Sequence, residues 1–411
     1  MGLGSEPENS MFRARSATVT PLFNTLASGH PRKPTAADQV AFNIGWDHAH
    51  HGLVPPPELL LEGSPVRQGW LAAKALFGQR NLANTRPVRQ WLGLRLQAWL
   101  RGIGFDLETL TPNYLAQIEV THCPATRHAL GGPAGSADAA VVERLHPLAD
   151  YSAGHVVVMS HSASQARAGC NADAALRFAK LAEQEGSVRG LDAPAWRRLA
   201  TLISFVNPSN HLEAARLPLL VLPPNRLLVL GTAQGLQTLI TRQLAAPGWS
   251  GRLRCLTETL DDTALRHDFV LFVGALAPRV LEWPTNQNKQ AQRQALEDLW
   301  LDACVMRRWQ HFVVQLGEAR CAVLVQRAAG LKIAGVHRVE HDGEQASFNT
   351  RTGVAPRLSA ENVAAAKVNA ANVIAANAWA KQPPHAGRPK TRRSPSAPKF
   401  DVTNQRPVSS T

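Results

Sequence analysis

A chain of 411 residues is longer than one hydrophobic core usually organises, so two folded domains with unstructured ends are expected. Its 45% of apolar residues is typical of a globular protein and excludes a chain that is disordered throughout. The 44 Lys and Arg against 31 Asp and Glu give a net charge of +13, which favours a polyanionic partner such as DNA or RNA.

Targeting and crosslinking signals are missing from the sequence. The first thirty residues contain no continuous apolar run, so no secretory signal is expected. The most apolar stretch, 217–231, is interrupted by prolines and an arginine and cannot cross a bilayer as one helix of roughly 20 apolar residues. The five cysteines are scattered without a C-x-x-C pair, which argues against a disulfide framework. We therefore expect a cytoplasmic protein that does not bind a membrane.

The N-terminal part is predicted to be helical after a flexible lead-in at residues 1–34. Thr35 and Asp38 have the spacing of a capping box, which predicts a helix that begins there and continues to about His51. A second helix is expected at 64–77, and the glycine that follows directly marks its end.

A third helix is expected at 87–100, with a proline at its start and glycines beyond its end. Its broad apolar face would consist of Val88, Trp91, Leu92, Leu96, Trp99 and Leu100. The opposite side carries three candidates for contact with phosphate, Arg86, Arg89 and Arg101. The alternative is that these arginines form only the solvated face of an amphipathic helix.

Strand and helix patterns alternate in the rest of the chain. Residues 156–159 show the clearest strand pattern, and 194–206 show a helix pattern. The apolar runs on either side of 223–226 predict a hairpin, 290–316 predicts one long helix, and 321–326 predicts a strand.

These patterns favour an α+β fold that is mainly α-helical. The expected division is a helical domain at 35–185 that contains the segment 121–167, a second α+β domain at 186–350, a terminal helix at 351–380 and a disordered basic tail at 381–411. The tail holds seven basic residues and one acid, so part of the charge excess is concentrated there.

The segment around 123–167 carries a series of short motifs. They read Cys-Pro-Ala-Thr-Arg from 123, Val-Val-Glu-Arg-Leu from 141, Tyr-Ser-Ala-Gly-His-Val from 151 and Ala-Ser-Gln-Ala-Arg from 163. This series resembles a divergent HNH endonuclease module. Members of that family often show Cys-Pro-x-Thr, an Asp-Arg-Ile or Asp-His-Ile step, a Gly-Tyr-x-x-Gly-Asn-Val turn and an Asn-x-x-Lys ending. The resemblance covers about 45 residues and implies a small ββα unit, a β-hairpin followed by a helix.

An active site of this family needs an imidazole that activates water and side chains that hold one divalent metal ion against the scissile phosphate. The resemblance puts Glu143 at the acidic position, His155 at the turn position and Ser164 at the final Asn or His position. Arg144 stands where a catalytic His can stand, yet arginine cannot act as a base at neutral pH. His146 and His161 lie nearby in the sequence and would have to supply the imidazole in its place. An active module would therefore use Glu143, His146, His155 and His161, with Mg²⁺, Mn²⁺ or Zn²⁺ on Glu143 and His155.

Two departures from the family pattern favour a degenerate module that does not cleave. Ser164 is a poor metal ligand, and Arg144 would contact phosphate rather than activate water. No cofactor is then required. The remaining alternative is that the likeness is accidental, with Cys123 and 156–158 in the core and His155 in a surface turn.

The basic tail has a motif of its own. Residues 387–389 read Gly-Arg-Pro with basic residues after them, which resembles an AT-hook that lies in the minor groove of A·T-rich DNA. Its candidate DNA contacts are Arg388, Lys390, Arg392 and Arg393. Non-specific attraction to phosphate is the alternative.

The leading functional hypothesis is therefore binding of nucleic acid, with duplex DNA favoured, by a protein built partly on a degenerate HNH-like module. One alternative is a metal-dependent endonuclease. Another is a non-enzymatic interaction or structural protein, for which 290–316 would supply the partner surface.

Overall fold

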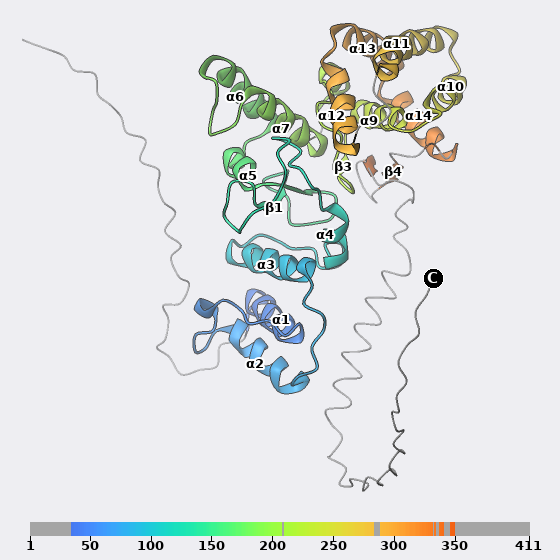
Figure 1. Ribbon diagram of the computed structural model, residues 1–411. Helices are drawn as coiled ribbons and strands as arrows, with labels where there is room; N and C mark the ends of the chain where they lie inside the picture. Colours follow the sequence, from blue (N-terminus) through green and yellow to red (C-terminus); the bar gives the residue numbers. More distant parts are fainter. Residues whose placement is uncertain are drawn as a thin grey trace, which may run out of the picture. The chain divides into compact units, whose positions relative to one another are not determined.

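The computed structural model describes residues 34–207, 209–282, 288–331, 333, 337–340 and 346–349 (Figure 1). All of them belong to the unit Met1–Gly353. Among these residues helices predominate and the strands form two small antiparallel sheets, so the predicted α+β, mainly α-helical class is confirmed. The predicted lead-in, terminal helix and basic tail lie outside the described residues, apart from Pro34.

The first two helices form a closely packed pair. Helix α1 (Ala36–His50) begins at the predicted capping box, in which the Thr35 and Asp38 side chains each accept the other residue's backbone N–H. Helix α2 (Pro65–Phe77) follows the short helix η1 (Pro57–Leu59). The pair crosses at two glycines, because a Cβ on Gly45 or Gly69 would lie only 1.9 Å from a backbone carbonyl oxygen of the other helix. No larger residue fits at either crossing point.

Helix α3 (Arg86–Leu100) connects this pair to the next layer, which includes helix α4 (Pro112–Ile118). Leu96 packs with the apolar side chains of α1, while Leu94 packs with those of α4. The buried Arg95 guanidinium donates a hydrogen bond to the Asp47 carboxylate of α1. The predicted apolar face is correct except at Leu100, which is 56% exposed.

The predicted hairpin and helix are present. Strand β1 (Ala140–Arg144) pairs antiparallel with β2 (Val156–Ser160), with Val142 opposite Val158, and helix α5 (His161–Arg167) follows directly. Val157 and Met159 belong to the largest core, whereas Val158 belongs to the core shared with α3 and α4. Because both faces of β2 are buried, its sequence is an apolar run without alternation.

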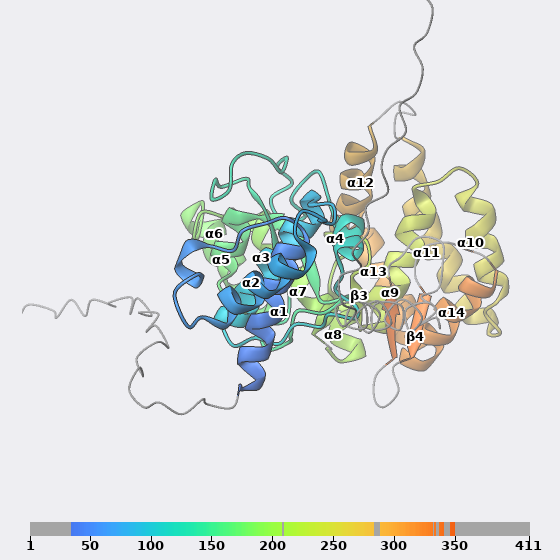
Figure 2. The same cartoon turned by 90° about the horizontal axis from the view of Figure 1, so that it is seen from below.

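The largest core includes the described C-terminal helices, and it extends across the expected domain boundary at residue 185. Helix α9 packs against α8, α10, α12 and α14 (Figures 1 and 2). The aromatic side chains that are fully buried in this largest core are Trp196, Trp300, Trp309, Phe205, Phe269, Phe272 and Phe312. The helices of this part are α6 (Ala172–Glu185), α7 (Ala193–Val206), α8 (His211–Arg216), α9 (Thr232–Leu244), α10 (Trp249–Glu258), α11 (Thr263–Leu281), α12 (Lys289–Asp298), η2 (Leu299–Leu301), α13 (Ala303–Leu316) and α14 (Glu318–Gly330).

The predicted hairpin around 223–226 is wrong. Only β3 (Leu228–Val229) forms a strand there, and its partner is β5 (Ala346–Asn349), which also pairs with β4 (His337–Glu340). Residues 217–222 instead form an irregular loop with bends, and the Leu222 N–H donates to the Glu297 side chain. Prolines interrupt this stretch and remove the N–H groups that a strand pair needs.

Two further predictions fail in the C-terminal helices. The long helix at 290–316 is broken into α12, η2 and α13, because the Asp302 carboxylate caps α13 by accepting the N–H groups of Cys304 and Val305. The strand at 321–326 is part of helix α14, in which Cys321, Leu324, Val325 and Ala328 are buried at helical spacing. Among the described residues, no helix has the length and apolarity that crossing a membrane requires.

Candidate functional site

The turn that leads into β2 is held from three sides. The Gly154 N–H donates to the Tyr114 hydroxyl of α4 at 2.7 Å, and that hydroxyl donates to the Arg226 carbonyl oxygen at 3.4 Å. Gly154 has a φ of 88°, and a Cβ there would lie 2.4 Å from the Leu228 side chain. Burial raises the pKa of Tyr114 to about 12, so its hydroxyl stays protonated at neutral pH. The next residue, His155, is therefore placed by a fixed backbone.

The carboxylate of Glu143 joins β1 to α5. Its side chain lies on the hairpin face that carries Leu145 and Val157, the face covered by α5. The Ser164 hydroxyl donates to Glu143 Oε2 at 2.5 Å, and Arg167 Nη1 donates to Oε1 at 3.0 Å. Both carboxylate oxygens are thus engaged by groups of the helix.

Arg167 is the buried member of this ion pair. Its side chain is 2% exposed, against 27% for Glu143, and it also donates to the Leu145 carbonyl oxygen. Burial lowers the pKa of the Arg167 guanidinium, and the Glu143 carboxylate opposes that shift. Since arginine ordinarily titrates above pH 12, the Arg167 guanidinium remains charged at neutral pH. The sequence analysis gave no role to Arg167, the last residue of the fourth motif.

The other predicted residues are divided between the two faces of the hairpin and its ends. Leu145 donates its N–H to the His155 carbonyl oxygen, so His155 lies beside Leu145 near the end of the face that carries Glu143. Arg144 points to the opposite face, where it donates to the Ala149 carbonyl oxygen and lies 5.1 Å from the Tyr151 ring centroid. His146 accepts the Leu148 N–H at 3.2 Å. His161 begins α5, and neither it nor His146 hydrogen-bonds to Glu143.

These groups do not fit a divalent metal ion. Glu143 is the single carboxylate in the cluster, and both of its oxygens already accept hydrogen bonds. A metal ion beside it would also face the positive charges of Arg167 and Arg144, which are close enough to repel one another. Within the described ranges, no group of three or more His, Cys, Asp and Glu side chains is arranged to hold a metal ion.

The predicted phosphate contacts of α3 are on its exposed side. Arg86, Arg89 and Arg101 are all exposed, as the sequence predicted. Arg86 lies 3.8 Å from the Glu119 carboxylate in a pair that is open to solvent, and Arg89 donates to the Asn84 carbonyl oxygen. Arg101 is 15 positions beyond Arg86, a separation of about 22 Å along the helix axis at 1.5 Å per residue. The predicted tail contacts lie outside the described residues.

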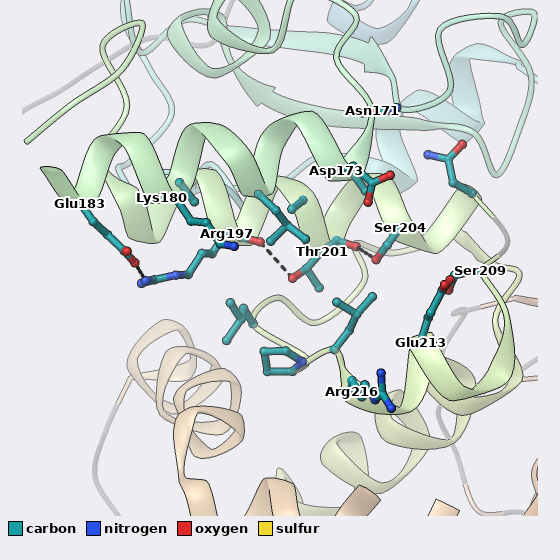
Figure 3. A pocket seen from close by; sticks show the side chains of 18 residues that line it. Asn171, Asp173, Lys180, Glu183, Arg197, Thr201, Ser204, Ser209, Glu213 and Arg216 are labelled. Carbon is teal, nitrogen blue, oxygen red and sulfur yellow. Dashed lines mark hydrogen bonds and ion pairs between the residues drawn. The ribbon is translucent and has the colours of Figure 1, made fainter. Parts of the chain in front are cut away.

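A groove of about 820 Å³ lies between α6, α7, α8 and the segment 217–220 (Figure 3). Figure 3 shows the Glu183–Arg197 ion pair at one end and Ser209 and Glu213 at the other. The hydroxyl of Thr201 donates to a carbonyl oxygen of its own helix. Sequence reasoning missed this groove, because its walls come from four separate segments that no single motif marks.

A second feature without a sequence signal is a partly buried ion cluster. Arg127, in the left-handed conformation with φ 65°, donates to the Asp298 carboxylate at 2.6 and 3.0 Å and to Glu297 at 3.2 Å. Glu297 also accepts hydrogen bonds from the Leu222 N–H and from Arg293. The cluster anchors the Cys-Pro-x-Thr loop to α12, although Arg127 and Glu297 are 170 positions apart in the sequence.

Comparisons of the chain with models of protein families, with curated protein sequences and with solved structures found no match. The likeness to HNH nucleases therefore depends on the four motifs and on the order of hairpin and helix that they implied.

Proposed function

We propose that the protein binds nucleic acid, with duplex DNA as the favoured ligand, and that it does not cleave it. The observation that carries the binding proposal is the exposed face of α3, which presents Arg86, Arg89 and Arg101 to solvent. Guanidinium groups on one open surface attract phosphate through charge and paired hydrogen bonds.

The distribution of charge adds the flanking segments to this surface. Residues 34–331 contain 28 Lys and Arg against 24 Asp and Glu, so most of the +13 is carried outside them. The segment 381–411 supplies the largest share, including Arg388, Lys390, Arg392 and Arg393. We propose that this segment attracts the polyanion, while the face of α3 orients it.

The absence of cleavage follows from the state of Glu143. A one-metal nuclease needs a carboxylate with free oxygens next to a group that can activate water. Here the Glu143 carboxylate is neutralised by Arg167 and receives the Ser164 hydroxyl. Arg144 is in the position of the base, and a guanidinium offers no acceptor for the proton of water.

The interaction-protein alternative depended on 290–316 as a partner surface. That stretch buries Leu296, Trp300, Trp309 and Phe312 in the main core. Its strongest apolar groups are thus used for folding, which leaves nucleic acid as the better-supported partner.

The salt dependence of duplex binding tests the α3 surface. Replacing Arg86, Arg89 and Arg101 with Ala should flatten the plot of log affinity against log salt by about 0.9 for each phosphate that these side chains neutralise. The matched control replaces three other exposed arginines, Arg307 and Arg308 of α13 and Arg320 of α14. The control removes the same charge, so equal effects in both variants would contradict a specific role for α3.

The tail is tested by deletion of 381–411, which should also flatten the salt dependence. If the Gly-Arg-Pro motif enters the minor groove, Arg388→Ala should weaken binding to A·T-rich duplex more than Arg406→Ala does. An unchanged affinity and salt slope after deletion would remove the tail from the proposal.

A further inference from the structure

The geometry points to Arg167 as a built-in cation, which takes the place of a divalent metal ion between β1 and α5. This inference uses the same HNH resemblance as the proposed function. It is carried, however, by the contacts of three described side chains.

The first step is that the two expected ligand positions do meet. Glu143 and Ser164 correspond to the acidic and final ligand positions of the motif, 21 residues apart in the chain. In the structure the Ser164 hydroxyl donates to the Glu143 carboxylate across the strand–helix contact. The scaffold therefore brings the ligand positions together as the module requires.

The second step is that a cation already contacts the carboxylate of this pair. Arg167 is one turn beyond Ser164 on the same helix, and its guanidinium donates to the remaining oxygen of Glu143. The same guanidinium donates to the Leu145 carbonyl oxygen, so it holds the strand at two points. A metal ion would crosslink strand and helix through the same carboxylate, and here the guanidinium makes that crosslink.

The third step concerns charge. One carboxylate and one guanidinium sum to zero, and the neighbouring Arg144 makes the local formal charge positive. A divalent cation would therefore gain no net attraction and would have to displace two hydrogen bonds from Glu143.

The α5 helix has only seven residues, too few to be stable alone, so its attachment depends on such a crosslink and on apolar packing.

Two consequences follow. The hairpin–helix unit should need no metal for its stability, and removal of the Arg167 charge should leave Glu143 as an uncompensated carboxylate that attracts a divalent cation. Arg167→Gln removes the charge and keeps a polar side chain. Arg167→Lys keeps the charge and is the matched control.

The test combines thermal unfolding with calorimetric titration of Mn²⁺ on the full chain. We expect the unfolding midpoint of the wild type and of Arg167→Lys to be the same in EDTA and in Mn²⁺, with no heat of binding. Arg167→Gln should unfold at a lower temperature in EDTA, and Mn²⁺ should raise its midpoint. Adding Glu143→Gln to that variant should abolish the response to Mn²⁺.

Two results would overturn the proposal. One is that the wild type binds Mn²⁺ and that Glu143→Gln abolishes this binding. The other is that Mn²⁺ leaves the unfolding midpoint of Arg167→Gln unchanged. If Arg167→Gln does not fold, the wild type and Arg167→Lys still test the inference. A midpoint that Mn²⁺ raises in either protein contradicts it, and midpoints that Mn²⁺ leaves unchanged in both support it. DNA affinity of the wild type, measured in parallel, separates the two proposals: no binding to DNA together with no response to Mn²⁺ would count against nucleic-acid binding alone.

Discussion

The crossing of α1 and α2 permits a sharp prediction, because it allows no side chain at Gly69. An added Cβ would lie 1.9 Å from the Phe42 carbonyl oxygen, whereas ordinary van der Waals contact begins near 3.4 Å. The helices would have to separate by about 1.5 Å, and the obstacle is backbone that cannot rotate away. Overpacking of this kind costs roughly 1–3 kcal/mol and occasionally more, so Gly69→Ala should lower the free energy of unfolding by about 2–3 kcal/mol.

The same substitution at Gly93 is the matched control. Gly93 lies inside α3 with no heavy atom within 4 Å of its added Cβ. Alanine is favoured over glycine inside a helix by roughly 0.5–1 kcal/mol, so Gly93→Ala should be stabilising. Urea denaturation followed by circular dichroism measures both variants, and hydrogen exchange of α1 and α2 locates the change. Equal stability of Gly69→Ala and Gly93→Ala would refute the close crossing.

Three further changes have predictable outcomes. Tyr114→Phe leaves the buried Gly154 N–H without its acceptor, and urea denaturation should show a loss of about 1–3 kcal/mol; an unchanged stability would contradict the described turn. Asp47→Ala leaves the buried Arg95 guanidinium without its carboxylate, so the free energy of unfolding should fall by about 3–5 kcal/mol. Burial lowers the pKa of His48 below its ordinary 6.5, so on acidification the unfolded chain binds the proton first. The free energy of unfolding should therefore fall as pH drops below about 6.5, and less so in His48→Gln; pH profiles of urea denaturation that coincide would refute this.

Elements with local signals were predictable from the sequence. The capping box at Thr35, the glycine after α2 and the apolar run of β2 each act within a few residues, and each element is present. The failures have equally local causes. The six apolar-rich residues from Cys321 fit a strand or a helix equally well, and the cap at Asp302 interrupts a stretch whose apolar periodicity continues through it.

The candidate site was predictable only in part. The motifs indicated that Glu143 and Ser164 belong to one hairpin–helix unit, and the structure brings them into contact. They did not indicate that Arg167 would neutralise Glu143, because pairing depends on side-chain direction in the last turn of α5. The pairing of β3 with β5 and the ion cluster at Arg127 join residues more than 100 positions apart, for which a single sequence carries no signal.

Electrophoresis of supercoiled plasmid DNA tests the central claim most directly. The protein is incubated with plasmid in Mg²⁺ or Mn²⁺, and samples are run both intact and after digestion of the protein. We predict a retarded band in the intact samples, abolished at high salt, and unchanged supercoiled DNA after digestion. Conversion to open circles that Glu143→Ala abolishes, or no retardation at low salt, would contradict a protein that binds nucleic acid without cleaving it.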